Sequence, residues 1–123
     1  GQLVELTKSL GEEEERHIRE NLTEEELVIF DILTRPAPDL SAEDRVAVKR
    51  VAKDLLERLT HLLDLDWRGR TGARSRVVVE IEDLLDARLP PVYTKPLYEE
   101  KVSKLFDHFY EEYPDRLNNV YAI

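Results

Sequence analysis

Apolar side chains recur along most of the chain at intervals of three and four residues, the spacing of one face of an α-helix. The longest such stripe begins after Ser41, which forms a weak capping box with Asp44, and it ends near Asp64. Its apolar positions are Val48, Val51, Ala52, Leu55, Leu56, Leu59, Leu62 and Leu63. We therefore predict a long central core helix over residues 41–64.

A shorter helix is predicted over residues 24–34. Thr23 and Glu26 have the spacing of a capping box, in which each side chain accepts a hydrogen bond from the other residue's backbone N–H. The segment is apolar nearly all round, so it is expected to be buried on more than one side. Pro36 and Pro38 end it.

Two more helices are predicted, over residues 73–87 and from Thr94 to Pro114. The first contains a β-branched run at residues 76–81 that also allows a strand, but apolar positions 77, 81, 84 and 85 favour a helix. Pro90 and Pro91 separate the two helices. The face of the second is made by Val102, Leu105, Phe106, Phe109, Tyr110 and Tyr113.

Short helices at residues 3–10 and 12–21 complete the pattern. The predicted fold is all-α, an irregular helical bundle of about five to six helices around a long central helix. We divide the chain into an N-terminal helical connector (residues 1–21), a helical domain (residues 22–113) and an irregular tail (residues 114–123).

Composition narrows the possible functions. A chain of 123 residues suits a single domain, and the absence of cysteine excludes disulfides, zinc–thiolate sites and thiol catalysis. The formal net charge is −9, so the chain as a whole lacks the basic footprint of a DNA-binding protein. Contact with DNA is therefore expected only through a protein partner or one local patch.

We expect a cytoplasmic protein without a membrane segment. The longest apolar runs, such as residues 77–79, are too short to cross a bilayer. Residues 1–5 have neither the basic nor the apolar part of a signal peptide. A first residue of Gly1 rather than Met leads us to expect a fragment of a longer parent chain.

Candidate metal ligands are few, and we predict no catalytic, cofactor or metal site in this chain. Glu14 with His17, and Glu57 with His61, have helical spacings that occur in metal sites. A metal-dependent hydrolase built from these four residues is one alternative function. Neither pair brings the further ligands that zinc requires, and surface pairs on helices are the ordinary interpretation.

The segments Pro38–Asp39 and Glu99–Glu100–Lys101 imitate the pattern of magnesium-dependent nucleases. Such sites need both halves on adjacent strands, whereas here one half is predicted in a loop and the other in a helix. We therefore expect a chance match. The sequence also lacks a P-loop for nucleotide phosphates.

The concentrated basic feature is a group of four arginines beside Trp67. They are Arg68, Arg70, Arg74 and Arg76. Arginine next to an aromatic ring can bind DNA phosphates and stack on bases. The alternative, which we favour, is that Trp67 fills the end of the core while the arginines balance the acidic face of a neighbouring helix.

Four segments occur in an order that has a counterpart in a known family. They are residues 22–36 (LTEEELVIFDILTRP), residues 48–56 (VKRVAKDLL), residues 65–67 (LDW) and the stretch from Leu89 to Tyr113. Together they resemble the C-terminal helical domain of the R subunit of type I restriction endonucleases. The resemblance covers residues 22–113, most of the chain.

The resemblance implies an assembly domain. In that family the R subunit cuts DNA after ATP-driven translocation, and its nuclease and motor regions precede this domain. ATP and Mg²⁺ would belong to the parent chain, and no nuclease or ATPase residue of the family has a counterpart here. The domain would join the motor to the methyltransferase (M) and specificity (S) subunits and reach DNA through the complex.

The expected partner contact lies on the aromatic face of the last helix. Its four rings are Phe106, Phe109, Tyr110 and Tyr113. Rings of this kind dominate binding energy where they are exposed. The alternative is that most of them lie in the core. Direct contact of the four arginines with the DNA backbone is the second functional hypothesis.

Overall fold

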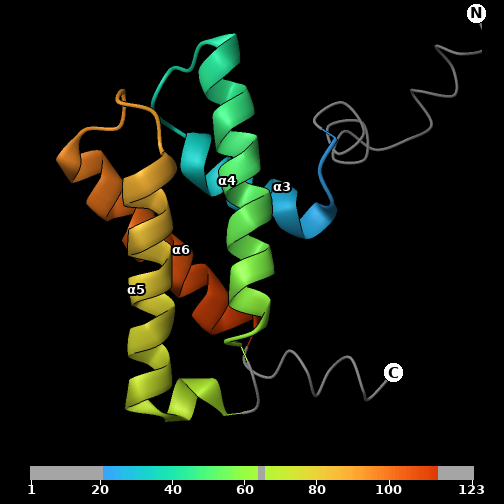
Figure 1. The fold of residues 1–123 in the computed structure, drawn as a ribbon, viewed down its shortest axis with the longest axis vertical. Coiled ribbons are helices and arrows are strands. Elements are labelled where there is room, and N and C mark those ends of the chain that lie inside the picture. Colours follow the sequence, from blue (N-terminus) through green and yellow to red (C-terminus); the bar gives the residue numbers. More distant parts are fainter. Residues whose placement is uncertain (1–20, 64–65, 114–123) are drawn as a thin grey trace, which may run out of the picture.

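The computed structural model describes residues 21–63 and 66–113, which form four α-helices and one short 3₁₀ turn (Figure 1). The helices are α3 (Glu24–Thr34), α4 (Ala42–Thr60), α5 (Thr71–Arg88) and α6 (Lys95–Glu112). The 3₁₀ turn, η1, spans Trp67–Gly69. The described residues contain no strand, so the all-α prediction is confirmed for them, and residues 76–81 are helical. The helices predicted at residues 3–10 and 12–21 lie outside this range.

The four helices surround a shared core. Helix α4 packs against α3 and α5, α5 packs against α6, and α6 returns to pack against α3. In Figure 1, α4 and α5 run side by side in opposite directions, and α6 crosses obliquely behind them. The prediction of one long central helix is not confirmed. Helix α4 has 19 residues, and α5 and α6 are almost as long, with 18 residues each.

Side-chain caps set where three of the helices begin. Both bonds of the capping box are present at Thr23, while the hydroxyls of Ser41 and Thr94 accept from the backbone N–H groups of Asp44 and Leu97. These bonds satisfy N–H groups that have no partner inside the helix. Helix α5 begins at Thr71, two residues before the predicted start. Helix α4 ends at Thr60, four residues before the predicted end.

The core is apolar apart from Lys101 and follows most of the predicted stripes, although Leu56 and Leu62 are only partly buried. Helix α4 buries Val48, Val51, Ala52, Leu55 and Leu59, and α5 buries Val77, Ile81, Leu84 and Leu85. Burying a side chain of this size stabilises the fold by about 1.5–3 kcal/mol. Helix α3 buries Leu27, Ile29, Phe30 and Leu33. It lies between α4 and α6, which is why its sequence is apolar on more than one side.

The C-terminal end of α3 is closed by groups from far along the chain. The Tyr93 hydroxyl donates to the carbonyl of Leu33 at 2.7 Å, and Lys101 Nζ donates to the carbonyl of Arg35 at 2.9 Å. The last carbonyls of a helix lack partners within it. These two bonds therefore give hydrogen-bond donors to carbonyls at the end of α3. They also fix the positions of the α5–α6 loop and of α6 against this helix.

Candidate interaction surfaces

Trp67 fills one end of the core. Its side chain is completely buried, and the rings of Phe106 and Tyr110 meet it edge to face at centroid distances of 6.1 Å each. The indole Nε1 donates to the carbonyl of Tyr113 at 2.6 Å. We call these four aromatic residues the Trp67 cluster. It joins η1 to the C-terminal half of α6.

Two of the four candidate DNA-binding arginines hold the backbone around this cluster. The Arg68 guanidinium donates to the carbonyl of Tyr110 at 2.8 Å and lies 5.0 Å from the centre of the Tyr110 ring. Arg74 donates to the carbonyl of Arg68 and to the Thr71 hydroxyl, the latter at 3.2 Å. Carbonyls and a hydroxyl, rather than an acidic face, thus receive these two side chains.

The other two candidate arginines, Arg70 and Arg76, are exposed. They lie immediately before α5 and within its second turn. The structure therefore places all four arginines around the start of α5, but it presents their guanidinium groups differently. Arg68 and Arg74 are partly buried, whereas Arg70 and Arg76 are exposed.

The four rings of the predicted partner contact do not share one surface. Phe109 is completely buried, Tyr113 is 5% exposed, and Phe106 is partly buried against the core. Tyr110 is 38% exposed. Of these four rings, Tyr110 offers the largest area to a partner, and Phe109 and Tyr113 serve mainly to pack α6 into the bundle.

His108 occupies the edge of this aromatic region. Its ring lies 5.2 Å from that of Phe109 and 5.8 Å from that of Tyr113, between centroids. Burial lowers the pKa of His108, because it disfavours the charged imidazolium, and the carboxylates of Glu112, Glu111 and Glu25 oppose that effect. The imidazole is therefore neutral in the folded protein near pH 7.

Two of the four candidate metal ligands, Glu57 and His61, lie within the described residues. Glu57 and His61 line a hollow of about 280 Å³ together with Asp54 and two arginines, one of which, Arg88, pairs with Asp54 at 2.7 Å. Within the described residues, no group of three His, Cys, Asp or Glu side chains is placed to hold a metal ion. Glu14 and His17 lie outside them. The structure thus offers the hydrolase hypothesis no support.

Lys101, the cation of the nuclease-like pattern, is completely buried. Its bond to the Arg35 carbonyl gives it a structural role, and burial lowers its pKa, with Lys104 adding to the effect. Asp39 and Glu99 are exposed. Sequence reasoning missed this buried charge, although position 101 falls on the same helical stripe as Leu105 and Phe109.

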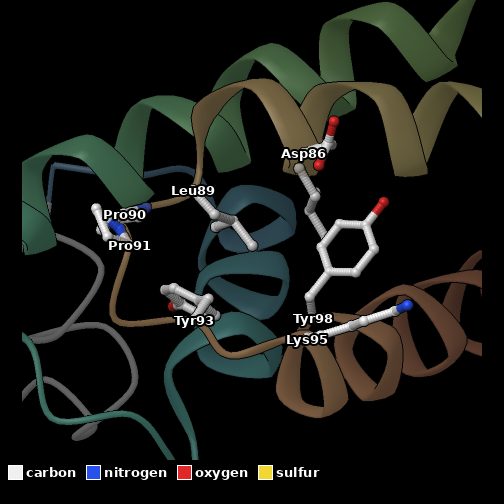
Figure 2. Close-up of a pocket in the computed structure, with 8 residues that line it drawn as sticks. Asp86, Leu89, Pro90, Pro91, Tyr93, Lys95 and Tyr98 are labelled. Atoms are coloured by element: carbon white, nitrogen blue, oxygen red, sulfur yellow. The ribbon is translucent and has the colours of Figure 1, made fainter.

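A larger hollow, of about 420 Å³, lies at the opposite end of the α5–α6 pair (Figure 2). We call it the Tyr98 pocket. Its lining consists of Leu85, Asp86, Leu89, Pro90, Pro91, Tyr93, Lys95 and Tyr98. The Tyr98 hydroxyl donates to the Glu82 carbonyl at 3.0 Å, which holds the ring against α5. The sequence indicated only a turn here, from Pro90 and Pro91.

Acidic side chains surround Tyr98. Burial raises the pKa of the Tyr98 phenol, and the negative charges of Glu82, Asp86, Asp83 and Glu99 raise it further. All four carboxylates are exposed. The two ends of the α5–α6 pair therefore differ in charge as well as in packing.

Comparison with known proteins identifies the class. The family described as type I restriction enzyme HindI endonuclease subunit-like, C-terminal, matches residues 1–110. The chain belongs to this family, and it is thus a C-terminal domain of a subunit of a restriction enzyme. No curated protein and no solved structure matches it. None of the described helices is long and apolar enough to cross a membrane.

Proposed function

We propose that this chain is the non-catalytic assembly domain of a type I restriction R subunit. It docks the ATP-dependent translocase and nuclease onto the complex of M and S subunits, in the cytoplasm, in defence against foreign DNA. The observation that carries this proposal is family membership over residues 1–110. In such a subunit the nuclease and motor regions precede the C-terminal domain. The contribution of the C-terminal domain is therefore to hold those catalytic regions in place.

The polar chemistry of the described residues supports a binding rather than a catalytic role. Among the described residues, His108 is half-buried with no hydrogen-bond partner at Nε2, but Lys101, Tyr93 and Arg74 donate to backbone carbonyls. Groups committed in this way stabilise the fold and cannot readily exchange partners during a reaction. ATP and Mg²⁺ would act in the parent chain, through residues outside this domain.

The test is a pull-down of the chain with the purified M–S complex of the same operon, with and without duplex DNA. We expect retention without DNA, because docking is a contact between proteins. Tyr110→Ala should weaken it if the exposed ring forms part of the contact. Failure to bind under both conditions would remove the docking role. Binding only with DNA would instead favour a direct contact with the duplex.

A second candidate function is contact with the DNA backbone near the start of α5. The exposure of Arg70 and Arg76 favours it, since guanidinium groups bind phosphates. Retention of the chain on duplex DNA should then fall steeply with added salt and be lost in the Arg70→Ala/Arg76→Ala variant. Absence of retention at low salt would end this candidate.

A further inference from the structure

The Tyr98 pocket has the size and the lining of a binding site. Its volume of about 420 Å³ lies in the range of ligand pockets, about 300–1,000 Å³. The pocket is formed where the C-terminal turn of α5, the loop of residues 89–94 and the first turns of α6 meet. Neither the Trp67 cluster nor the candidate arginines contribute to it.

One wall of the pocket is apolar. Leu85 and Tyr93 are buried at its base, and Leu89 is partly exposed beside them. Figure 2 shows Leu89 pointing toward the space between the loop and α6. Val92, in the same loop, is 40% exposed. This surface suits the aliphatic part of a partner side chain.

The other wall is an aromatic ring beside carboxylates. In Figure 2 the Tyr98 ring lies between Asp86 on α5 and Lys95 on α6. The carboxylates of Glu82, Asp83 and Glu99 also act on this tyrosine. A ring face with carboxylates near it attracts a cation, and a guanidinium can stack on such a ring more readily than an ammonium can.

Lys95 is the cationic residue of the pocket lining. It stands in the first turn of α6, where a positive charge interacts unfavourably with the helix dipole. The lining itself contains one carboxylate, that of Asp86, and the carboxylates of Glu82, Asp83 and Glu99 also act on Tyr98, so negative charges near the ring outnumber this ammonium group. A cationic ligand therefore gains from the carboxylates and is opposed in part by Lys95.

We propose that the Tyr98 pocket docks a basic segment of the partner protein. An arginine side chain of that segment lies along the Tyr98 ring with its guanidinium toward Asp83 and Asp86, and a neighbouring apolar residue packs on Leu89 and Val92. This inference rests on the proposed docking role and adds the chemistry of the partner. The charge complementarity of the site selects a basic protein segment over an acidic segment or a nucleic acid.

The first experiment uses a defined peptide as the probe. The isotopically labelled chain is titrated with acetyl-Gly-Leu-Arg-Leu-Gly-amide, and the backbone amide signals of the chain are followed by NMR. The control is the same peptide with Glu in place of Arg. We expect shifts confined to residues 82–99 with the arginine peptide and none with the glutamate peptide. Equal shifts with both peptides, no shifts, or shifts centred elsewhere would overturn the proposal.

Matched variants test the charges. Asp83→Asn/Asp86→Asn should weaken the arginine peptide about tenfold, the combined effect of two exposed charge pairs. Lys95→Gln should strengthen it, because it removes the opposing cation. The control is Glu111→Gln, which also removes a negative charge from an exposed residue but at the far end of α6. It should leave the affinity for the arginine peptide unchanged. An unchanged affinity in the double variant would contradict the assignment.

The second experiment separates this inference from the docking role itself. Wild-type chain and the Asp83→Asn/Asp86→Asn variant are compared for retention on the M–S complex. Retention of the wild type with reduced retention of the variant supports both proposals. Equal retention keeps the docking role and rejects the pocket as its site. If neither is retained, the docking role fails and the peptide titration decides whether the pocket binds a basic segment.

Discussion

The α5–α6 pair is completed differently at its two ends. At the start of α5, Trp67, Phe106 and Tyr110 fill the space between the helices, and Arg68 and Arg74 bond to nearby carbonyls. At the end of α5, tyrosines line a hollow of about 420 Å³ instead of filling it. Figure 1 shows these ends at opposite extremes of the helix pair.

The difference shows that residue type alone does not reveal whether a surface is available to a partner. Both ends contain aromatic rings next to charges. At the Trp67 cluster the charges are cations bonded to the protein's own backbone, so they contribute to stability. Around Tyr98 the charges are four carboxylates and the ammonium group of Lys95, all exposed to water, which leaves them able to meet a partner. We therefore expect substitutions at the first end to affect stability and those at the second to affect binding.

The largest expected effect is from Trp67→Ala. Removing a completely buried ring and its bond to Tyr113 should lower the free energy of unfolding by about 3–5 kcal/mol, measured by urea denaturation followed by circular dichroism. Tyr98→Ala, at the other end, should cost less because that ring is only partly buried. Equal losses from the two substitutions would remove the distinction between the ends.

Arg68→Ala should come next. It removes the bond to the Tyr110 carbonyl and the contact with the Tyr110 ring, and we expect a loss of about 1–2 kcal/mol in the same assay. Arg76→Ala is the matched control, since Arg76 is exposed, and it should change stability by less than about 0.5 kcal/mol. A larger loss from Arg76→Ala would show that both arginines support the fold.

Gly72→Ala tests whether the start of α5 has room to spare. The backbone at Gly72 is helical. Apart from the backbone of its own helix, no heavy atom would lie within 4 Å of a methyl group at this position. Alanine restricts the unfolded chain more than glycine does, so stability should rise by about 0.4–1 kcal/mol. Thermal melting provides the measurement. A fall in melting temperature would indicate that the position is packed.

The smallest effect should be a pH dependence at His108. Its folded pKa is lowered, so on acidification the unfolded chain takes up a proton first, below pH 6.5. Stability should therefore be complete above that pH and fall until the folded pKa is reached. His108→Phe keeps a ring against Phe109 and Tyr113 but cannot titrate. The midpoint of urea denaturation is measured for both proteins between pH 7.5 and pH 5. If it changes with pH by the same amount in the two proteins, the expected role of His108 is contradicted.

Much of the fold could be predicted from the sequence, because the helical stripes and caps are local signals. The stripe of α4, the capping box at Thr23 and the stop before Pro36 all correspond to the structure. The predicted number of about five to six helices is not confirmed, because the described residues form four and the two short predicted helices lie outside them. The stripe of α4 could not reveal whether this helix lies at the centre, since which helices pack together depends on contacts distant in sequence.

The candidate sites were less predictable. Spacing placed Phe109 and Tyr110 next to one another on a helical face, but it could not reveal that the first is buried and the second is 38% exposed. The Tyr98 pocket depends on how the end of α5, the loop after Pro90 and the start of α6 come together, and local sequence signals do not reveal that arrangement. The buried Lys101 was detectable from its position on an apolar stripe, but its acceptor, the Arg35 carbonyl, was not.

The bonds that close α3 have a consequence for synthesis of the protein. Leu33 receives its donor from Tyr93 and Arg35 from Lys101, over sequence separations of 60 and 66 residues. At a translation rate of about 5–20 residues per second, roughly 3–13 s pass between the making of each carbonyl and of its donor. During that interval α4 and then α5 are made, but the ring of helices stays open until α6 is present. Helix α6, the last of the four described helices to be made, is therefore the one that completes the ring.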